Sequence, residues 1–177
     1  MEAKETEKLA RKAIKGNAKA YGRLIEDQKE YLYRMAYLYM KNEAEALDVV
    51  GDCILNGFKS ISGLKNPQFF HTWLTRILIN TAKSRLKKTV WMEDYDQLRN
   101  AAPEEGLSVE EKMDLHRAID RLPDKYRTVV LLKYFFDMKT REIAYVMEIP
   151  EGTVKAYLSR ARDALRSDLK EDYRYAN

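Results

Sequence analysis

Basic and polar side chains near the carboxyl end of the chain are the clearest candidates for chemistry. Four of them repeat at i, i+4, i+7 and i+11, so one helical face carries Lys155, Ser159, Arg162 and Arg166. Such a face can hold phosphates, and its first residues can reach base edges in a major groove. The neighbouring Arg160 has the forked donors that recognise guanine. We predict a DNA-contacting helix; an ordinary amphipathic surface helix is the alternative.

A second basic cluster lies in the first half of the chain. No acidic residue interrupts residues 76–88, which contain Arg76, Lys83, Arg85, Lys87 and Lys88. Residues 1–90 carry 17 basic and 10 acidic side chains, whereas residues 91–111 carry one basic and seven acidic. A local excess of positive charge favours a polyanion partner, although a solvated helix end has the same composition.

Several classes of protein are not supported by the sequence. There is no Gly-rich phosphate loop, no His-Glu-x-x-His motif and no cysteine pair, and His71 and His116 lack ligand-like neighbours. We therefore expect no enzyme activity, no metal, no cofactor and no small-molecule substrate. The single Cys53 is expected to be a small core residue in a reducing compartment. Without a signal peptide or an apolar run near the ~20 residues of a membrane span, we expect a cytoplasmic protein.

The elements that position these residues are predicted to be helices throughout. Apolar side chains recur at helical spacing, Gly and Pro are scarce, and no alternating stretch predicts a strand. In residues 43–58 the expected core positions are Leu47, Val50, Ile54 and Phe58. Residues 89–109 lack periodicity. We therefore predict an all-α protein with two small helical domains, residues 1–90 and 110–177, joined by a flexible acidic linker at residues 91–109. The expected helices cover residues 2–15, 17–41, 43–58, 67–88, 109–121 (capped by Ser108), 124–136, 140–147 and 151–166.

The last two of these helices predict a helix-turn-helix. Thr140 is the expected N-cap of the first helix, which must stop before Pro150 because proline disfavours the α conformation at Ile149. Pro150 also suits the first turn of the second helix. Four residues of that helix are expected to pack on the domain core: Val154, Leu158, Ala161 and Leu165.

These segments resemble bacterial sigma factors of the sigma-70 family, of the extracytoplasmic-function (ECF) type. Residues 122–127, 141–144 and 151–165 resemble the final domain of the family. Residues 44–52 resemble its helix that binds core polymerase, and residues 70–87 resemble its helix that reads the minus-ten element. The resemblance covers nearly the whole chain in the right order.

The resemblance implies a role for each of these segments. It implies polymerase contacts at Glu45, Asp48 and Asp52, with Leu47 and Gly51 where the family more often has Glu and Gln. It implies capture of the minus-ten strand and a flipped base by the loop at residues 60–67, with Ser62, Lys65 and Asn66, together with Asn80 and Lys83. It implies that Arg76, Arg85, Lys87 and Lys88 hold phosphates. It implies minus-thirty-five recognition by Lys155, Ala156, Ser159, Arg160 and Arg162.

The implied partners are core RNA polymerase, promoter DNA and a membrane-anchored anti-sigma factor that acts in a stress or cell-envelope response. Three alternatives stay open at this point. Phe69, Phe70 and Trp73 could stack on single-stranded bases or belong to the core. The acidic linker could mimic nucleic acid in a basic channel or be merely solvated. The chain could also be a dimeric DNA-binding regulator, which leaves residues 1–90 unexplained, or a protein-binding adaptor, which the basic residues 76–88 argue against.

Overall fold

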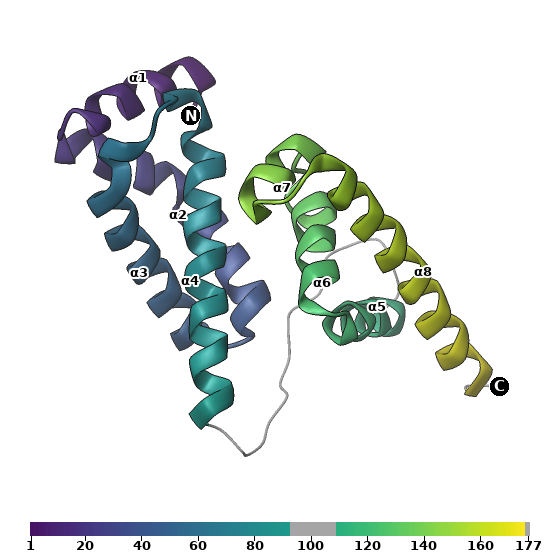
Figure 1. Ribbon diagram of the computed structural model, residues 1–177. Coiled ribbons are helices and arrows are strands. Elements are labelled where there is room, and N and C mark those ends of the chain that lie inside the picture. Colours follow the sequence, from purple (N-terminus) through teal and green to yellow (C-terminus); the bar gives the residue numbers. More distant parts are fainter. Residues whose placement is uncertain (93–108, 176–177) are drawn as a thin grey trace. The chain divides into compact units, whose positions relative to one another are not determined.

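The computed structural model describes the backbone of residues 1–92 and 109–175, and the side chains of residues 1–86 and 115–168. All elements within these ranges are helices (Figure 1), which confirms the prediction of an all-α protein. The chain divides into two compact units, Met1–Ala101 and Ala102–Asn177. Most of the predicted acidic linker lies outside the described residues, as does Ser108, the predicted cap of the fifth helix.

The first unit is a four-helix assembly in which α2, α3 and α4 pack on one another and α1 packs on α2. A short 3₁₀ turn, Ile61–Gly63, lies in the expected loop before α4. A second one, Pro67–Phe69, occupies the predicted first turn of the long helix, so α4 begins three residues later than predicted. Both turns contact α1. Asn17 and Asn42 begin α2 and α3, because their side chains accept hydrogen bonds from the backbone N–H groups of Ala20 and Glu45. The helices are α1 (Ala3–Ile14), α2 (Ala18–Met40), α3 (Glu43–Ser60) and α4 (Phe70–Met92).

The buried face of α3 differs from the predicted one. Leu47 and Phe58, expected in the core, are 54% and 48% exposed. The helix instead buries small side chains: Ala46, Val49, Cys53 and Gly57. Gly57 lies so close to α2 that an added Cβ would collide with the Tyr21 hydroxyl oxygen. Small residues let neighbouring helices approach closely, so a pattern based on large apolar residues picks the wrong face.

The second unit consists of α5 (Val109–Arg121), α6 (Asp124–Val130), α7 (Thr140–Met147) and α8 (Glu151–Tyr175). The single helix predicted for residues 124–136 is an α-helix that continues as a π-helical turn, Leu131–Phe135. Leu131 and Leu132 of this turn are buried in the core. Helix α8 packs on α5, α6 and α7, and its backbone extends well beyond the predicted end near Arg166.

Helix α7 has the predicted bounds, Thr140–Met147, but its N-cap differs from the predicted one. The N-cap is Lys139 and not Thr140, which is the first helical residue. The Glu142 carboxylate accepts a hydrogen bond from the Lys139 backbone N–H at 2.8 Å, so the carboxylate satisfies a group that the helix leaves free. The helix ends at Met147, because Glu148 takes a left-handed conformation with φ 56°.

Candidate functional site

Helices α7 and α8, with the turn between them, form the predicted helix-turn-helix. Val154, Leu158 and Ala161 of α8 are buried as predicted, whereas Leu165 is half-buried. The Tyr157 ring meets the Tyr126 ring of α6 edge-on at a centroid distance of 5.4 Å. These contacts fix the rotation of α8 about its own axis, and so determine which residues face solvent.

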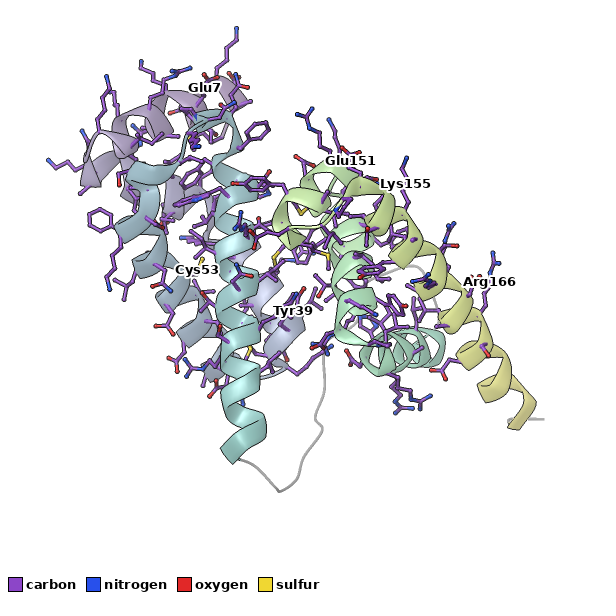
Figure 2. The ribbon with its side chains drawn as sticks, viewed as in Figure 1. Glu7, Tyr39, Cys53, Glu151, Lys155 and Arg166 are labelled. Carbon is purple, nitrogen blue, oxygen red and sulfur yellow. The ribbon has the colours of Figure 1, made fainter. Side chains whose placement is uncertain are left out.

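The solvent-facing side of α8 carries the residues predicted to read DNA. Lys155, Ser159, Arg160 and Arg162 are exposed and Ala156 is half-buried. Figure 2 shows Lys155 in the first turns and Arg166 further along the same helix. Among the described residues, Lys155, Arg160 and Arg162 have no ion-pair partner, although ion pairs are common elsewhere in the chain. Their positive charges are therefore available to an external anion.

The basic residues of α4 separate onto two sides of the helix. Arg76, Asn80 and Lys83 follow at i, i+4 and i+7 and so share one face, where Asn80 is exposed and the other two are half-buried. Arg85 is about 180° away around the helix, since each residue turns it by about 100°. The side chains of Lys87 and Lys88 lie outside the described ones.

The loop that precedes α4 exposes the other residues predicted to contact the minus-ten strand. Ser62, Lys65 and Asn66 are all exposed. The Asn66 side-chain oxygen accepts a hydrogen bond from the Gln68 backbone N–H at 3.1 Å and thereby caps the turn Pro67–Phe69. The three predicted stacking residues divide, because Phe70 is fully buried, Trp73 is half-buried and Phe69 is 43% exposed. Phe70 is thus a core residue, and only Phe69 and Trp73 have a ring edge or face near solvent.

Three acidic residues of α3 surround the guanidinium of Arg85. The Asp48 carboxylate accepts a hydrogen bond from Nη2 of Arg85 at 2.6 Å, and the Asp52 carboxylate lies 3.5 Å from Nη1. Glu45 accepts from Nε, and this hydrogen bond is the main cause that raises the pKa of Arg85 above its ordinary value. We call Glu45, Asp48 and Asp52 the acidic row. The family resemblance implies a DNA contact for Arg85 and polymerase contacts for the acidic row, whereas the structure brings these two groups together.

An exposed apolar strip runs beside the acidic row on α3. Leu47 and Leu55 are 54% and 58% exposed, and Phe58, which also contacts the Tyr21 ring, is 48% exposed. With Gly51, these residues repeat at i, i+4, i+8 and i+11 along one helical side. This strip could have been predicted from the sequence, because its four positions follow one another at about one helical turn. They point to a different side of the helix axis from Val49 and Cys53. Clustered exposed apolar side chains mark surfaces that bind other proteins.

The remaining candidate sites add no further chemistry. Cys53 is fully buried, and burial raises the pKa of its thiol to about 12, so the reactive thiolate is disfavoured. No group of His, Cys, Asp and Glu within the described ranges is arranged to hold a metal ion. None of the helices in those ranges is long and apolar enough to cross a membrane.

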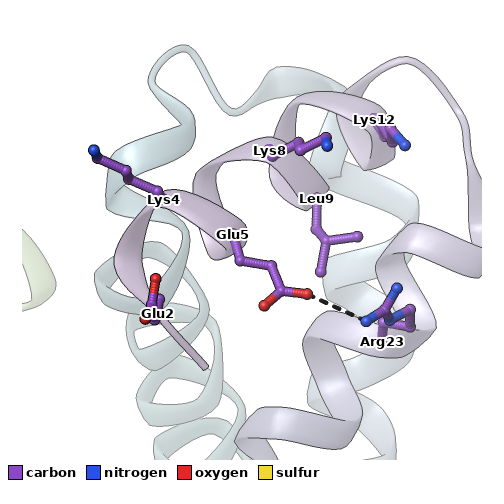
Figure 3. A pocket seen from close by; sticks show the side chains of 7 residues that line it. All are labelled: Glu2, Lys4, Glu5, Lys8, Leu9, Lys12 and Arg23. Atoms are coloured by element: carbon purple, nitrogen blue, oxygen red, sulfur yellow. Dashed lines mark hydrogen bonds and ion pairs between the residues drawn. The ribbon is translucent and has the colours of Figure 1, made fainter.

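A hollow of about 390 Å³ lies between α1 and α2, bounded by Leu9, several lysines and the Glu5–Arg23 ion pair of 3.2 Å (Figure 3). It contains none of the predicted site residues.

Comparison with known proteins links both units to one family. The family model described as Sigma-70 region 2 matches residues 24–92, and the one described as Sigma-70, region 4 matches residues 112–165. The chain is 36% identical over 150 residues to RNA polymerase sigma factor SigV of Bacillus subtilis, with 84% of this chain and 90% of SigV covered. It is 30% identical over 180 residues to the ECF RNA polymerase sigma factor SigW of the same organism, with 93% and 96% covered.

Solved structures share the fold. CnrH, in complex with the cytosolic domain of CnrY, aligns with a TM-score of 0.72 and 23% identity over 95% of this chain and 99% of CnrH. The sigma factor RpoE of Bartonella quintana, in complex with the anti-sigma factor NepR, aligns with a TM-score of 0.69 and 22% identity over 86% and 98%. The match to region 2 accounts for the half of the chain that a dimeric DNA-binding regulator would leave unexplained. The chain therefore belongs to the sigma-70 family of RNA polymerase sigma factors, in its ECF group.

Proposed function

We propose that this protein binds bacterial core RNA polymerase and directs it to specific promoters. The observation that carries the proposal is the surface of α3, where an acidic row and an exposed apolar strip lie side by side. A face of this composition suits a protein partner, because the apolar strip favours burial and the carboxylates favour a basic surface. The same unit carries the basic face of α4, so one compact body has both a protein-binding and a DNA-binding side. Members of the family are transcription initiation factors and not enzymes.

We assign polymerase binding and minus-ten recognition to residues 1–90, and minus-thirty-five recognition to residues 110–177, with residues 91–109 as the linker. The two family-model matches, to residues 24–92 and 112–165, support this division. Because the two DNA-reading surfaces belong to separate units, we expect each to have only modest specificity for its element by itself. Specificity would then come from both elements being present at a suitable spacing.

The minus-ten strand would be captured where the loop at residues 60–67 precedes α4. A base must leave the stack before its edge can be read in a pocket, which is why exposed loop residues are suited to the task. We propose contacts from Ser62, Lys65, Asn66, Arg76, Asn80, Lys83, Lys87 and Lys88. For the minus-thirty-five element we propose Lys155, Ala156, Ser159, Arg160 and Arg162.

We also propose that an anti-sigma factor controls the protein. Two structures with the same fold were solved as complexes, one with the anti-sigma factor NepR and the other with the cytosolic domain of CnrY. A membrane-anchored anti-sigma factor would hold the protein at the membrane within the cytoplasm until a stress or cell-envelope signal releases it. Co-purification of the protein from its host, before and after envelope stress, tests this part.

Two matched double variants test the role of α3. Asp48→Asn with Asp52→Asn removes two carboxylates of the acidic row without changing side-chain size. Glu26→Gln with Glu30→Gln removes two exposed carboxylates of α2 and serves as the control. The affinity of each for core RNA polymerase is measured by fluorescence anisotropy. We expect the first to weaken binding by about tenfold or more, because charge pairs at interfaces are costly to truncate, and the control to bind like wild type. Equal affinity of the two double variants would overturn the assignment of α3.

A further inference from the structure

We propose that Arg85 is a positioning residue of the polymerase-binding surface and not a phosphate contact. Its guanidinium holds the acidic row in one arrangement, which α3 then presents to a basic surface of the polymerase. The proposal rests on the proposed function, because it concerns the same binding face. It assigns to protein binding an arginine that lies within the basic cluster at residues 76–88.

Arg85 leaves α4 on the side that faces α3. Leu78 and Ala82 are fully buried against the rest of the unit, and Arg85 follows them at i+7 and i+3. It therefore continues the side of α4 that packs on α3, where the apolar contact ends and the acidic row begins. Arg76, Asn80 and Lys83 lie on the opposite side of the helix.

The guanidinium of Arg85 is already occupied. Each of its three nitrogens contacts a different carboxylate: Nε contacts Glu45, Nη2 contacts Asp48 and Nη1 contacts Asp52. A phosphate would have to compete with three carboxylates that are already in place. Lysine could not hold such an arrangement, because its ammonium is a point charge without a planar fork.

The carboxylates of the acidic row gain order from this arrangement. Glu45, Asp48 and Asp52 lie within two turns of one helix, where like charges repel. Arg85 offsets this repulsion and contacts each carboxylate through a single oxygen. The Asp48 and Asp52 side chains stay 61% and 55% exposed, so they can still accept from an external donor. Three carboxylates and one guanidinium leave a net charge of −2, which remains attractive to a basic partner. Ordering these side chains before binding lowers the entropic cost of the complex.

The experiment compares three variants of the full chain. Arg85→Ala removes the guanidinium, Arg85→Lys keeps the charge without the fork, and Lys19→Ala removes one exposed positive charge at the start of α2 as the matched control. Affinity for core RNA polymerase from Bacillus subtilis is measured by fluorescence anisotropy. Holoenzymes are then assembled with saturating variant, and the salt dependence of their binding to promoter DNA is measured. Circular dichroism confirms that each variant is folded; partly exposed ion pairs contribute little to stability, so we expect folded proteins.

We expect Arg85→Ala to weaken polymerase binding about three- to tenfold, Arg85→Lys to restore little of it, and Lys19→Ala to match wild type. The slope of log K against log salt for promoter binding should equal that of wild type, because the substitution removes no phosphate neighbour. A slope smaller in magnitude by about 0.7–0.9 in Arg85→Ala, the range for one phosphate of single-stranded or duplex DNA, would identify a phosphate contact and overturn the proposal, whether or not polymerase affinity changes. Unchanged polymerase affinity, or full rescue by Arg85→Lys, would also overturn it. If the wild-type protein does not bind polymerase, the proposed function itself is refuted. That result is distinct from a failure of the Arg85 proposal, which requires wild type to bind.

Discussion

Replacing Arg160 by alanine is the sharpest perturbation of the DNA-reading surface. Arg160 is exposed on α8 and has no ion-pair partner among the described residues, so DNA binding breaks no such pair. Helix α8 is anchored by Val154, Leu158 and Ala161, all of which are buried, and truncation of Arg160 should not disturb them. The expected cost is that of one bidentate interaction with a base, about 1–3 kcal/mol, or about five- to 150-fold in affinity.

The assay measures binding of the holoenzyme to promoters that carry each single substitution in the minus-thirty-five element. We expect Arg160→Ala to reduce discrimination at one base position and to retain it at the others. Arg162→Ala is the comparison, since removing a phosphate-binding side chain from the same helix should weaken all sequences equally and lower the salt slope by about 0.9. If Arg160→Ala weakens every sequence by the same factor, Arg160 touches phosphate only, and its role as a base reader is refuted.

Three further predictions concern stability. Gly57→Ala should destabilise the first unit by about 1–3 kcal/mol, because the new Cβ displaces the buried Tyr21 hydroxyl. Gly22→Ala has open space at its Cβ and should stabilise the unit by about 0.5–1 kcal/mol. Urea unfolding measures both free energies of unfolding, and equal effects would contradict the packing of α2 on α3. Thr128→Val should raise the stability of the second unit by up to about 1–2 kcal/mol, because the buried Thr128 hydroxyl has no hydrogen-bond partner in the described part of the chain. A lower thermal midpoint of the variant would show that this hydroxyl is satisfied. Burial raises the Cys53 pKa to about 12, so the stabilising contribution of the neutral thiol is complete below its unfolded-state pKa of about 9 and is lost as pH rises toward 12. Cys53→Ala should therefore flatten the fall of the thermal midpoint above pH 9. A variant whose midpoint falls with pH as steeply as that of wild type would contradict this.

Much of the fold follows from periodicity, and the errors of the prediction have physical causes. The ends of α1 and α2 agree with the prediction to within a residue or two, because Gly16, Asn17 and Lys41–Asn42 provide clear breaks. The predicted face of α3 was wrong, because close packing on α2 and α4 favours Ala46, Cys53 and Gly57 over the larger residues that the pattern weighted. Local spacing cannot report how closely a neighbouring helix approaches.

The candidate site shows the same division between local and long-range information. The exposed face of α8 was predictable, since its buried residues and its exposed residues each recur at steps of three and four along the helix. The contact between Arg85 and the acidic row was not predicted, because 40 residues separate Arg85 from Glu45 and only the packing of α3 on α4 joins them. Arg85 lies three residues after Ala82, which is buried, and this spacing places Arg85 on the packed side of α4. The prediction instead followed the positive charge of the cluster, which favoured DNA as the partner.

Run-off transcription tests the central claim most directly. Core RNA polymerase is incubated with a library of promoter sequences, with and without the purified protein, and the transcripts are sequenced. If the protein is a sigma factor that reads two elements, transcripts will arise from a subset of templates that share both elements at one fixed spacing. If the protein adds no transcripts above those of core polymerase alone, the account of its function is contradicted.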